Sequence, residues 1–175
     1  GGGYTGQRFA VAASRELGLA IQLTSRSGKT SHGMDADPWR WLVFNAASGD
    51  IPNLEELAGT THVLVTLPPD RDGNDPALEH LGPLLRQLPV AWLGYLSTTG
   101  VYGDHEGAWV DETTPTLATQ PRSLQRLAAE QGWRDGLTQG SLAGGLLLLA
   151  ATPPRESLQV FALLAVAVAF VSASQ

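Results

Sequence analysis

The chain has 175 residues, of which 43% are hydrophobic and 16% are charged, so it is not a disordered protein. Its net charge of −6 argues against a nucleic-acid partner, because such proteins usually carry a basic face. The absence of cysteine excludes disulfides, thiolate metal sites and cysteine nucleophiles. This composition is compatible with a cytoplasmic protein, which is the location we expect.

Two apolar runs, 142–151 and 160–171, lie near the C-terminus. Each is shorter than the roughly 20 residues that a membrane-spanning helix needs, so we do not expect a membrane protein. The four histidines are far apart in the sequence and lack the spacing of metal ligands, so we expect no metal site.

Helical and strand patterns alternate along the chain. A helix is predicted over 6–17, where Phe9, Ala13 and Leu17 share one face and Gly18 suits the C-cap. Further helices are predicted over 53–57, 76–88 and 122–133, the second with a kink at Pro83. Strands are predicted over 19–24, 41–46, 62–67 and 90–97. This alternation predicts an α/β fold, a Rossmann-type doubly wound parallel sheet in three layers.

The first six residues, Gly-Gly-Gly-Tyr-Thr-Gly, fit the pattern G-x-G-x-x-G and precede a predicted helix. In a dinucleotide-binding loop the first glycine permits a tight turn, the second lets a pyrophosphate approach, and the third packs the helix on the sheet. The free N–H groups at the helix start favour phosphate. The predicted cofactor-binding residues of this loop are Gly1, Gly3, Tyr4, Thr5 and Gly6.

Arg26 follows the strand predicted at 19–24, which comes after the glycine loop and its helix. At this place an NAD-preferring site usually has an acidic residue that bonds the ribose 2′-hydroxyl. An arginine can instead pair with a 2′-phosphate. We therefore expect NADP(H) to be preferred, while NAD(H) stays an alternative. A solvated arginine at the end of a strand is the other interpretation of Arg26.

Three later segments resemble the extended short-chain dehydrogenases/reductases, such as the nucleotide-sugar epimerases and dehydratases. They are Ser-Thr-Thr-Gly-Val-Tyr-Gly-Asp at 97–104, Asp-Glu-Thr-Thr-Pro at 111–115 and Leu-Ala-Ala-Glu at 127–130. The resemblance implies an NAD(P)-dependent enzyme that acts on a nucleotide sugar or a similar small molecule. It leaves open whether the protein forms a homo-oligomer.

The resemblance also implies site residues and shows where this chain departs from the family. Thr98 aligns with the hydroxyl that bonds the substrate carbonyl, and Leu67 and Pro68 would line the nicotinamide side. Arg122 and Arg126 stand where the family has its catalytic tyrosine and lysine. Because an arginine stays protonated, it cannot replace a phenol as acid and base. The chain is therefore similar to atypical members of the superfamily, which keep the cofactor fold without the usual pair.

The family has a strand before its glycine loop, and this chain has no residues there. Without that strand, the two strands that normally flank it would expose unpaired main-chain hydrogen-bonding groups. The simplest explanation is that the sequence is a fragment. We expect a cofactor domain at 1–133 and a divergent apolar segment at 134–175. A shifted reading frame or a divergent end would both produce such a segment. Residues 160–171 could also fold back as a strand. The alternatives to an enzyme are a non-catalytic NADP(H)-binding sensor or scaffold, and a truncated product without independent function.

Overall fold

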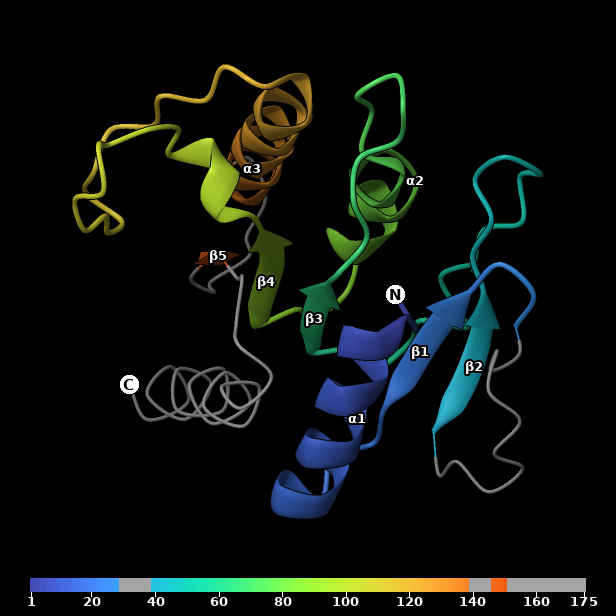
Figure 1. Ribbon diagram of the computed structural model, residues 1–175. Coiled ribbons are helices and arrows are strands. Elements are labelled where there is room, and N and C mark those ends of the chain that lie inside the picture. The colour runs from blue at the N-terminus through green and yellow to red at the C-terminus, as the bar shows by residue number, and fades with distance from the viewer. Residues whose placement is uncertain (29–38, 139–145, 151–175) are drawn as a thin grey trace.

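The computed structural model describes residues 1–28, 39–138 and 146–150 (Figure 1). In these ranges the structure contains the four predicted strands and three of the four predicted helices. The elements in chain order are α1 (Tyr4–Leu17), β1 (Gln22–Ser25), β2 (Arg40–Val43), β3 (His62–Val65), α2 (Pro76–Leu85), β4 (Trp92–Ser97), the short 3-10 helix η1 (Thr99–Val101), α3 (Pro121–Thr138) and β5 (Leu146–Ala150). None of the described residues between β1 and β3 is helical.

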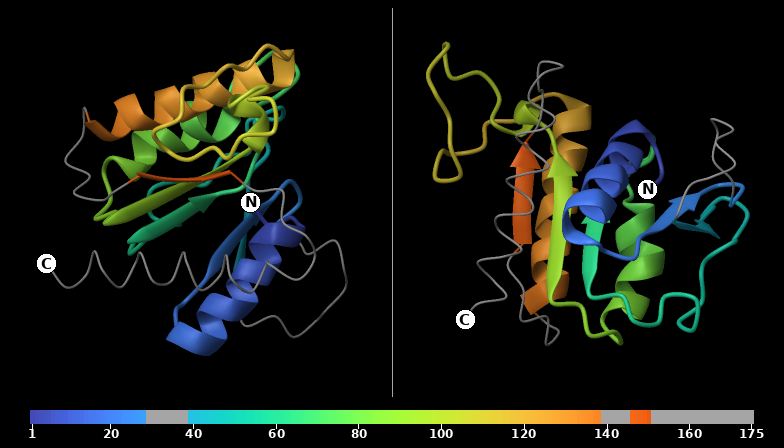
Figure 2. Two further views of the ribbon diagram at one scale, coloured as in Figure 1. Left: turned by 60° about the vertical axis from the view of Figure 1, so that its left-hand side comes forward. Right: turned by 90° about the horizontal axis from the view of Figure 1, so that it is seen from below.

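The strands of the described ranges form two parallel sheets. The order is β1-β2 in one and β3-β4-β5 in the other, with Leu23 opposite Trp41 and Val63 opposite Leu93. Helices α2 and α3 cover one side of β3 and β4, and α1 lies on the opposite side (Figure 2). The predicted Rossmann-type architecture is confirmed, with two separate sheets in place of one continuous sheet.

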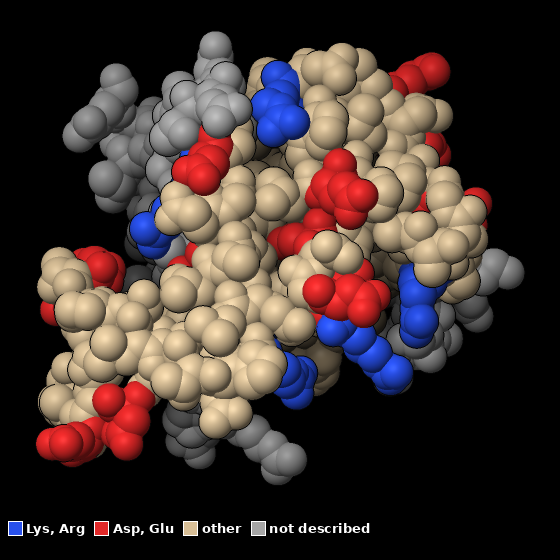
Figure 3. All heavy atoms as spheres, turned by 90° about the horizontal axis from the view of Figure 1, so that it is seen from above, with Lys and Arg blue, Asp and Glu red and all other residues tan. Residues whose placement is uncertain are grey.

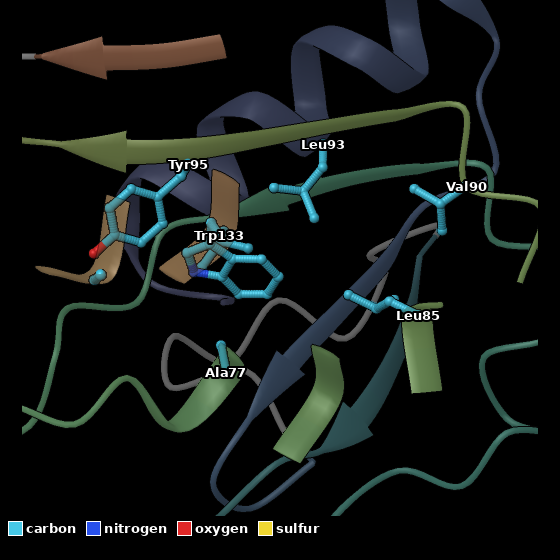
Figure 4. Packing of buried hydrophobic residues seen from close by; sticks show 8 residues of the cluster. Ala77, Leu85, Val90, Leu93, Tyr95 and Trp133 are labelled. Carbon is cyan, nitrogen blue, oxygen red and sulfur yellow. The ribbon is translucent and has the colours of Figure 1, made fainter. Parts of the chain in front are cut away.

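The largest buried cluster lies between β3, β4 and the two helices that cover them. Tyr95 and Leu93 project from β4 toward Trp133 of α3 and Ala77 of α2, and Leu85 and Val90 close one end (Figure 4). Tyr95 and Leu93 are almost inaccessible to solvent. Burial of these large apolar side chains fixes the position of α3 over β4.

Helix α1 begins at Tyr4, two residues before the predicted start, and ends at Leu17 as predicted. Gly18 adopts a left-handed conformation with φ 62°, and its N–H reaches the carbonyl oxygens of Ala13 and Ser14. This is the glycine C-cap that the sequence predicted.

Helix α2 runs through Pro83 and ends at Leu85, three residues before the predicted end. The helix predicted over 53–57 is wrong, because that segment forms hydrogen-bonded turns. Asn53 and Glu56 do exchange side-chain-to-backbone bonds of 2.9 and 3.0 Å, which would start a helix. Gly59, with φ 78°, ends the turn soon afterwards.

Regular structure continues after Trp133, the residue at which the last helix was predicted to end. Helix α3 continues to Thr138, and Leu146–Ala150 forms β5, which pairs in parallel with β4. This strand was not predicted from the sequence. The segment 160–171, for which a strand was one of the predictions, lies outside the described residues. The division at residue 133 stays a prediction.

None of the helices in the described ranges has the length and apolar character to cross a membrane. On the side covered by α2 and α3, acidic and basic side chains are interspersed (Figure 3).

Candidate functional site

The glycine loop bridges the carboxyl ends of β1 and β3. The N–H of Gly2 donates to the carbonyl oxygen of Thr24 at 2.6 Å, and the hydroxyl of Thr66 donates to the carbonyl oxygen of Gly1 at 3.2 Å. The carboxyl edge of a parallel α/β sheet is where ligands of such folds bind. The loop therefore lies at the edge where a cofactor is expected.

The glycines of this loop differ in the space around them. A Cβ on Gly6 would overlap the carbonyl oxygen of Gly1, so this position has no room for a side chain. A Cβ on Gly3 would meet no atom within 4 Å. These surroundings match close packing at the third glycine of the pattern and open space at the second. Gly2 is also constrained, because its Cβ would overlap the Trp41 ring, which the pattern alone did not indicate.

The start of α1 has unpaired donors. Gly3 is the N-cap and supplies no side-chain hydrogen bond, and Gln7 N–H is the first to bond back, to Gly3 O at 3.0 Å. Within the described residues the N–H groups of Tyr4, Thr5 and Gly6 therefore have no acceptor. They and the helix dipole suit an anionic group.

Two predicted residues of this region are exposed. The Tyr4 side chain is 66% exposed and lies against Arg8, whose guanidinium carbon is 5.5 Å from the centre of the tyrosine ring. Arg26 is exposed in the turn directly after β1, at the same edge as the glycine loop.

Arg126 connects the ends of β3 and β4. Its Nη1 donates to Leu96 O at 2.8 Å, to the Tyr95 hydroxyl at 3.1 Å and to Leu67 O at 3.5 Å. The guanidinium carbon also lies 5.7 Å from the centre of the Tyr95 ring. Since Leu67 packs beside Gly1, the structure places Arg126, Leu67 and the glycine loop along one edge. Pro68 follows Leu67 and is exposed.

Thr98 and Arg122 complete the predicted residues. The half-buried Thr98 hydroxyl accepts a bond from Gly100 N–H at 3.3 Å and caps η1. Arg122 is exposed in the first turn of α3, one turn before Arg126, and its side chain makes no hydrogen bond or ion pair in the described part of the chain. The side chain of Arg126, in contrast, is held by three acceptors.

Two tyrosines lie near this edge, and both have a raised pKa. Burial raises the pKa of Tyr95, although Arg126 opposes the shift. Partial burial and the carboxylates of Glu130, Glu112 and Asp111 raise the pKa of Tyr102. A tyrosine that acts as a general base needs a lowered pKa, so the direction of these shifts does not favour that role for either phenol.

One buried polar pair was not predicted from the sequence. The Ser97 hydroxyl donates to a carboxylate oxygen of Glu130, and both residues are buried. Among the described residues no three His, Asp or Glu side chains are grouped so that they could hold a metal ion.

Comparison with solved structures places this geometry among known folds. A conserved protein of unknown function from Silicibacter pomeroyi is 37% identical, with a TM-score of 0.65 over 85% of this chain and 49% of its own. UDP-glucuronic acid 4-epimerase from Bacillus cereus is 13% identical, with a TM-score of 0.66 over 83% and 53%. An NAD-dependent NDP-hexosamine 5,6-dehydratase involved in tunicamycin biosynthesis is 16% identical, with a TM-score of 0.66 over 85% and 51%. This chain has the fold of the NAD-dependent epimerases and dehydratases.

The epimerase/dehydratase fold confirms the resemblance to extended short-chain dehydrogenases at the level of architecture. The chain spans about half the length of the solved structures it matches. No protein-family model and no curated protein matches the sequence.

Proposed function

We propose that the chain binds NAD(P)(H) through its glycine loop, and that it contributes the cofactor-binding part of an enzyme acting on a nucleotide sugar or a similar small molecule. The observation that carries this proposal is the contrast between Gly6, which is closed against Gly1, and Gly3, which is open. Beside them the N–H groups of Tyr4 and Thr5 have no acceptor within the described residues. A pyrophosphate fits this combination of open space and free donors.

The preference that we propose is NADP(H) over NAD(H). Arg26 is exposed directly after β1, and a guanidinium can form charge-assisted bonds with a ribose 2′-phosphate. The turn that holds it, Ser-Arg-Ser-Gly at 25–28, contains no carboxylate to accept a bond from a free 2′-hydroxyl.

Residues at the ends of β3 and β4 would contact the nicotinamide and the substrate. The bound cofactor would supply hydride transfer. In this proposal Leu67 and Pro68 line the nicotinamide side, and the hydroxyl of Thr98 donates a hydrogen bond to a substrate oxygen. Arg126 holds the strand ends in place and presents a fixed positive charge, but it cannot move a proton.

A non-catalytic sensor or scaffold that binds NADP(H) is the second candidate. It is favoured by Arg122 and Arg126 in the tyrosine and lysine positions, and by the raised pKa of both nearby phenols. In such a protein cofactor binding would control the binding of a partner.

The experiment is a fluorescence titration of the chain with NADPH and with NADH, for the wild type, Arg26→Ala and Arg15→Ala. Arg15 is an exposed arginine in the last turn of α1 and serves as the matched control. We expect NADPH to bind at least about tenfold more tightly than NADH, with the difference lost only in Arg26→Ala. Equal affinity for both cofactors contradicts the preference, and no binding of either contradicts cofactor binding by this chain.

Hydride exchange with a panel of carbonyl compounds and sugar nucleotides then separates the two candidates. Turnover that falls in Thr98→Ala supports the enzyme. Cofactor binding without exchange on any substrate supports the sensor.

A further inference from the structure

The loop 66–75, between β3 and α2, lies at the end of the sheet to which the arrows of β3 and β4 point, and α3 begins at that end (Figure 1). The side-chain amide of Gln125 in α3 donates to the carbonyl oxygen of Arg71 at 3.5 Å. Gly73 packs on the same glutamine, since a Cβ there would lie 3.1 Å from Gln125 Cγ. These two contacts fix the main chain of Arg71 beside the second turn of α3.

The acidic side chains of this loop are largely engaged within it, whereas its arginine is not. Asp70 Oδ1 accepts from the amides of Asp72 and Asn74 at 2.9 Å, and Asp75 caps α2. Only the carboxylate of Asp72 is exposed without such a bond among the described residues. The guanidinium of Arg71 is exposed, and it makes no hydrogen bond or ion pair within the described ranges. The loop therefore presents a cation from a fixed main chain.

Arg122 is a second exposed arginine at this end of the sheet. It lies in the first turn of α3, where its side chain likewise lacks a bonded partner among the described residues. The helix dipole places a partial positive charge at this end of a helix, so a cation here is repelled. The first turn holds no acidic side chain that would offset this repulsion. An anion that binds from outside would do so.

The two exposed arginines are neighbours across Gln125. Residues three apart in a helix lie about 5–6 Å apart at their Cβ atoms, so Arg122 adjoins the glutamine that bonds the main chain of Arg71. Arg126 follows one turn later on the same face as Arg122, and its guanidinium is fixed to Leu96 O at 2.8 Å. Three positive charges therefore gather at the start of α3, in a chain whose net charge is −6.

This group of arginines adjoins Thr98 rather than the glycine loop. The start of α3 lies directly against η1, because a Cβ on Gly100 would be 2.6 Å from Ser123 Oγ. Thr98 caps η1 through the N–H of Gly100. The glycine loop, in contrast, bonds to the residues at the ends of β1 and β3. An anion at the start of α3 would therefore lie beside the hydroxyl of Thr98.

We propose that Arg71 and Arg122 together bind one anionic group of the substrate, a carboxylate or a phosphate, beside Thr98. A guanidinium has paired N–H donors whose geometry matches both kinds of oxyanion. The inference rests on the proposed function only in assigning the anion to the substrate, because the anion site itself needs no cofactor. Such a site selects a substrate that is charged next to the oxygen that Thr98 bonds.

The test follows the arginine Nε–H signals by NMR, since each guanidinium is then observed separately. The full chain is titrated with methyl phosphate and, in a second series, with acetate. Arg71→Ala and Arg122→Ala assign the two signals. Arg15 and Arg86, which are exposed at the ends of α1 and α2, are the matched controls.

We expect the signals of Arg71 and Arg122 to follow one binding curve, about tenfold or more tighter than the response of either control. Each alanine variant should weaken binding at the remaining arginine by about tenfold, since one guanidinium is lost from a shared site. The probe that binds more tightly identifies the group as phosphate or carboxylate. Two different curves, or affinities equal to those of the controls, overturn the proposal.

The same titration in saturating NADPH separates the substrate side from the cofactor. We expect the affinity for the probe to stay unchanged, because the cofactor phosphates lie at the glycine loop. Loss of probe binding in NADPH would assign the two arginines to a cofactor phosphate and would also overturn the proposal. A chain that binds the probe at both arginines but does not bind NADPH contradicts the proposed function and supports the anion site.

Discussion

The hydroxyl of Ser97 donates a hydrogen bond to the carboxylate of Glu130 and so connects the end of β4 to α3. Ser97 is 7% exposed and Glu130 6% exposed. Thr98 follows Ser97 directly, and Arg126 lies one turn before Glu130. The bond therefore ties the strand end that carries Thr98 to the helix that carries Arg126.

Replacement of Ser97 by alanine is expected to destabilise the fold. The change leaves a buried carboxylate without its donor, at a cost of about 1–3 kcal/mol in the free energy of unfolding. Urea denaturation followed by tryptophan fluorescence measures this loss.

A double-mutant cycle with Glu130→Leu tests whether the pair is the cause. When Glu130 is already apolar, Ser97→Ala should cost much less than it does in the wild type. Strictly additive losses would show that the two side chains do not interact energetically.

Asp75 stabilises two helices at once. Its Oδ1 accepts from Ala77 N–H and Leu78 N–H at the start of α2, and its Oδ2 accepts from Trp133 Nε1 at 2.8 Å. Asp75→Ala should lower stability by about 2 kcal/mol or more, since it removes an N-cap and leaves the buried indole donor unpaired. Asp75→Asn keeps a capping oxygen and should lie between alanine and wild type in thermal unfolding. An asparagine variant as unstable as the alanine variant would contradict a capping role.

The regular elements could be predicted where the local sequence carries the signal. The apolar run at 62–67 predicted β3, and Gly18 marked the end of α1. The glycine pattern agrees with the open space at Gly3 and the close packing at Gly6, but it did not indicate the constraint at Gly2. Strand β5 was missed because Leu146–Ala150 is uniformly apolar, so no period of two distinguishes a strand from a helix.

The contacts that build the site could not be predicted. Ser97 and Glu130 are 33 residues apart, and Trp133 and Asp75 are 58 apart. Such pairs depend on how α3 crosses the sheet, which no local pattern encodes. Arg126 was predicted from the resemblance as a site residue, but its three bonds to the ends of β3 and β4 became evident only from the fold.

Alanine substitutions at two glycines of the loop should affect different properties: cofactor affinity at Gly3 and thermal stability at Gly6. Gly3→Ala places a methyl group in open space at φ −69°, so the melting temperature should change little. The same methyl group would block the approach of a pyrophosphate, so cofactor affinity should fall by about tenfold or more. Fluorescence titration with NADPH and thermal unfolding give both values.

Gly6→Ala is the matched variant. Its methyl group overlaps the carbonyl oxygen of Gly1, so the melting temperature should fall through overpacking that costs about 1–3 kcal/mol. If Gly3→Ala bound NADPH as well as wild type, the pyrophosphate could not lie over this loop.

The buried amino group of Gly1 should make stability depend on pH. Its pKa falls from 8.0 to about 6 in the folded chain because burial disfavours the charged form. Between these values the unfolded chain binds more protons, so the free energy of unfolding should rise as the pH rises from 6 to 8 and level off above that. The gain should be roughly 1–2 kcal/mol, since Gly1 is partly exposed. Urea denaturation across this range measures it, and acetylation of the amino group should remove this part of the slope. An unchanged slope after acetylation would mean that the amine remains hydrated in the folded chain.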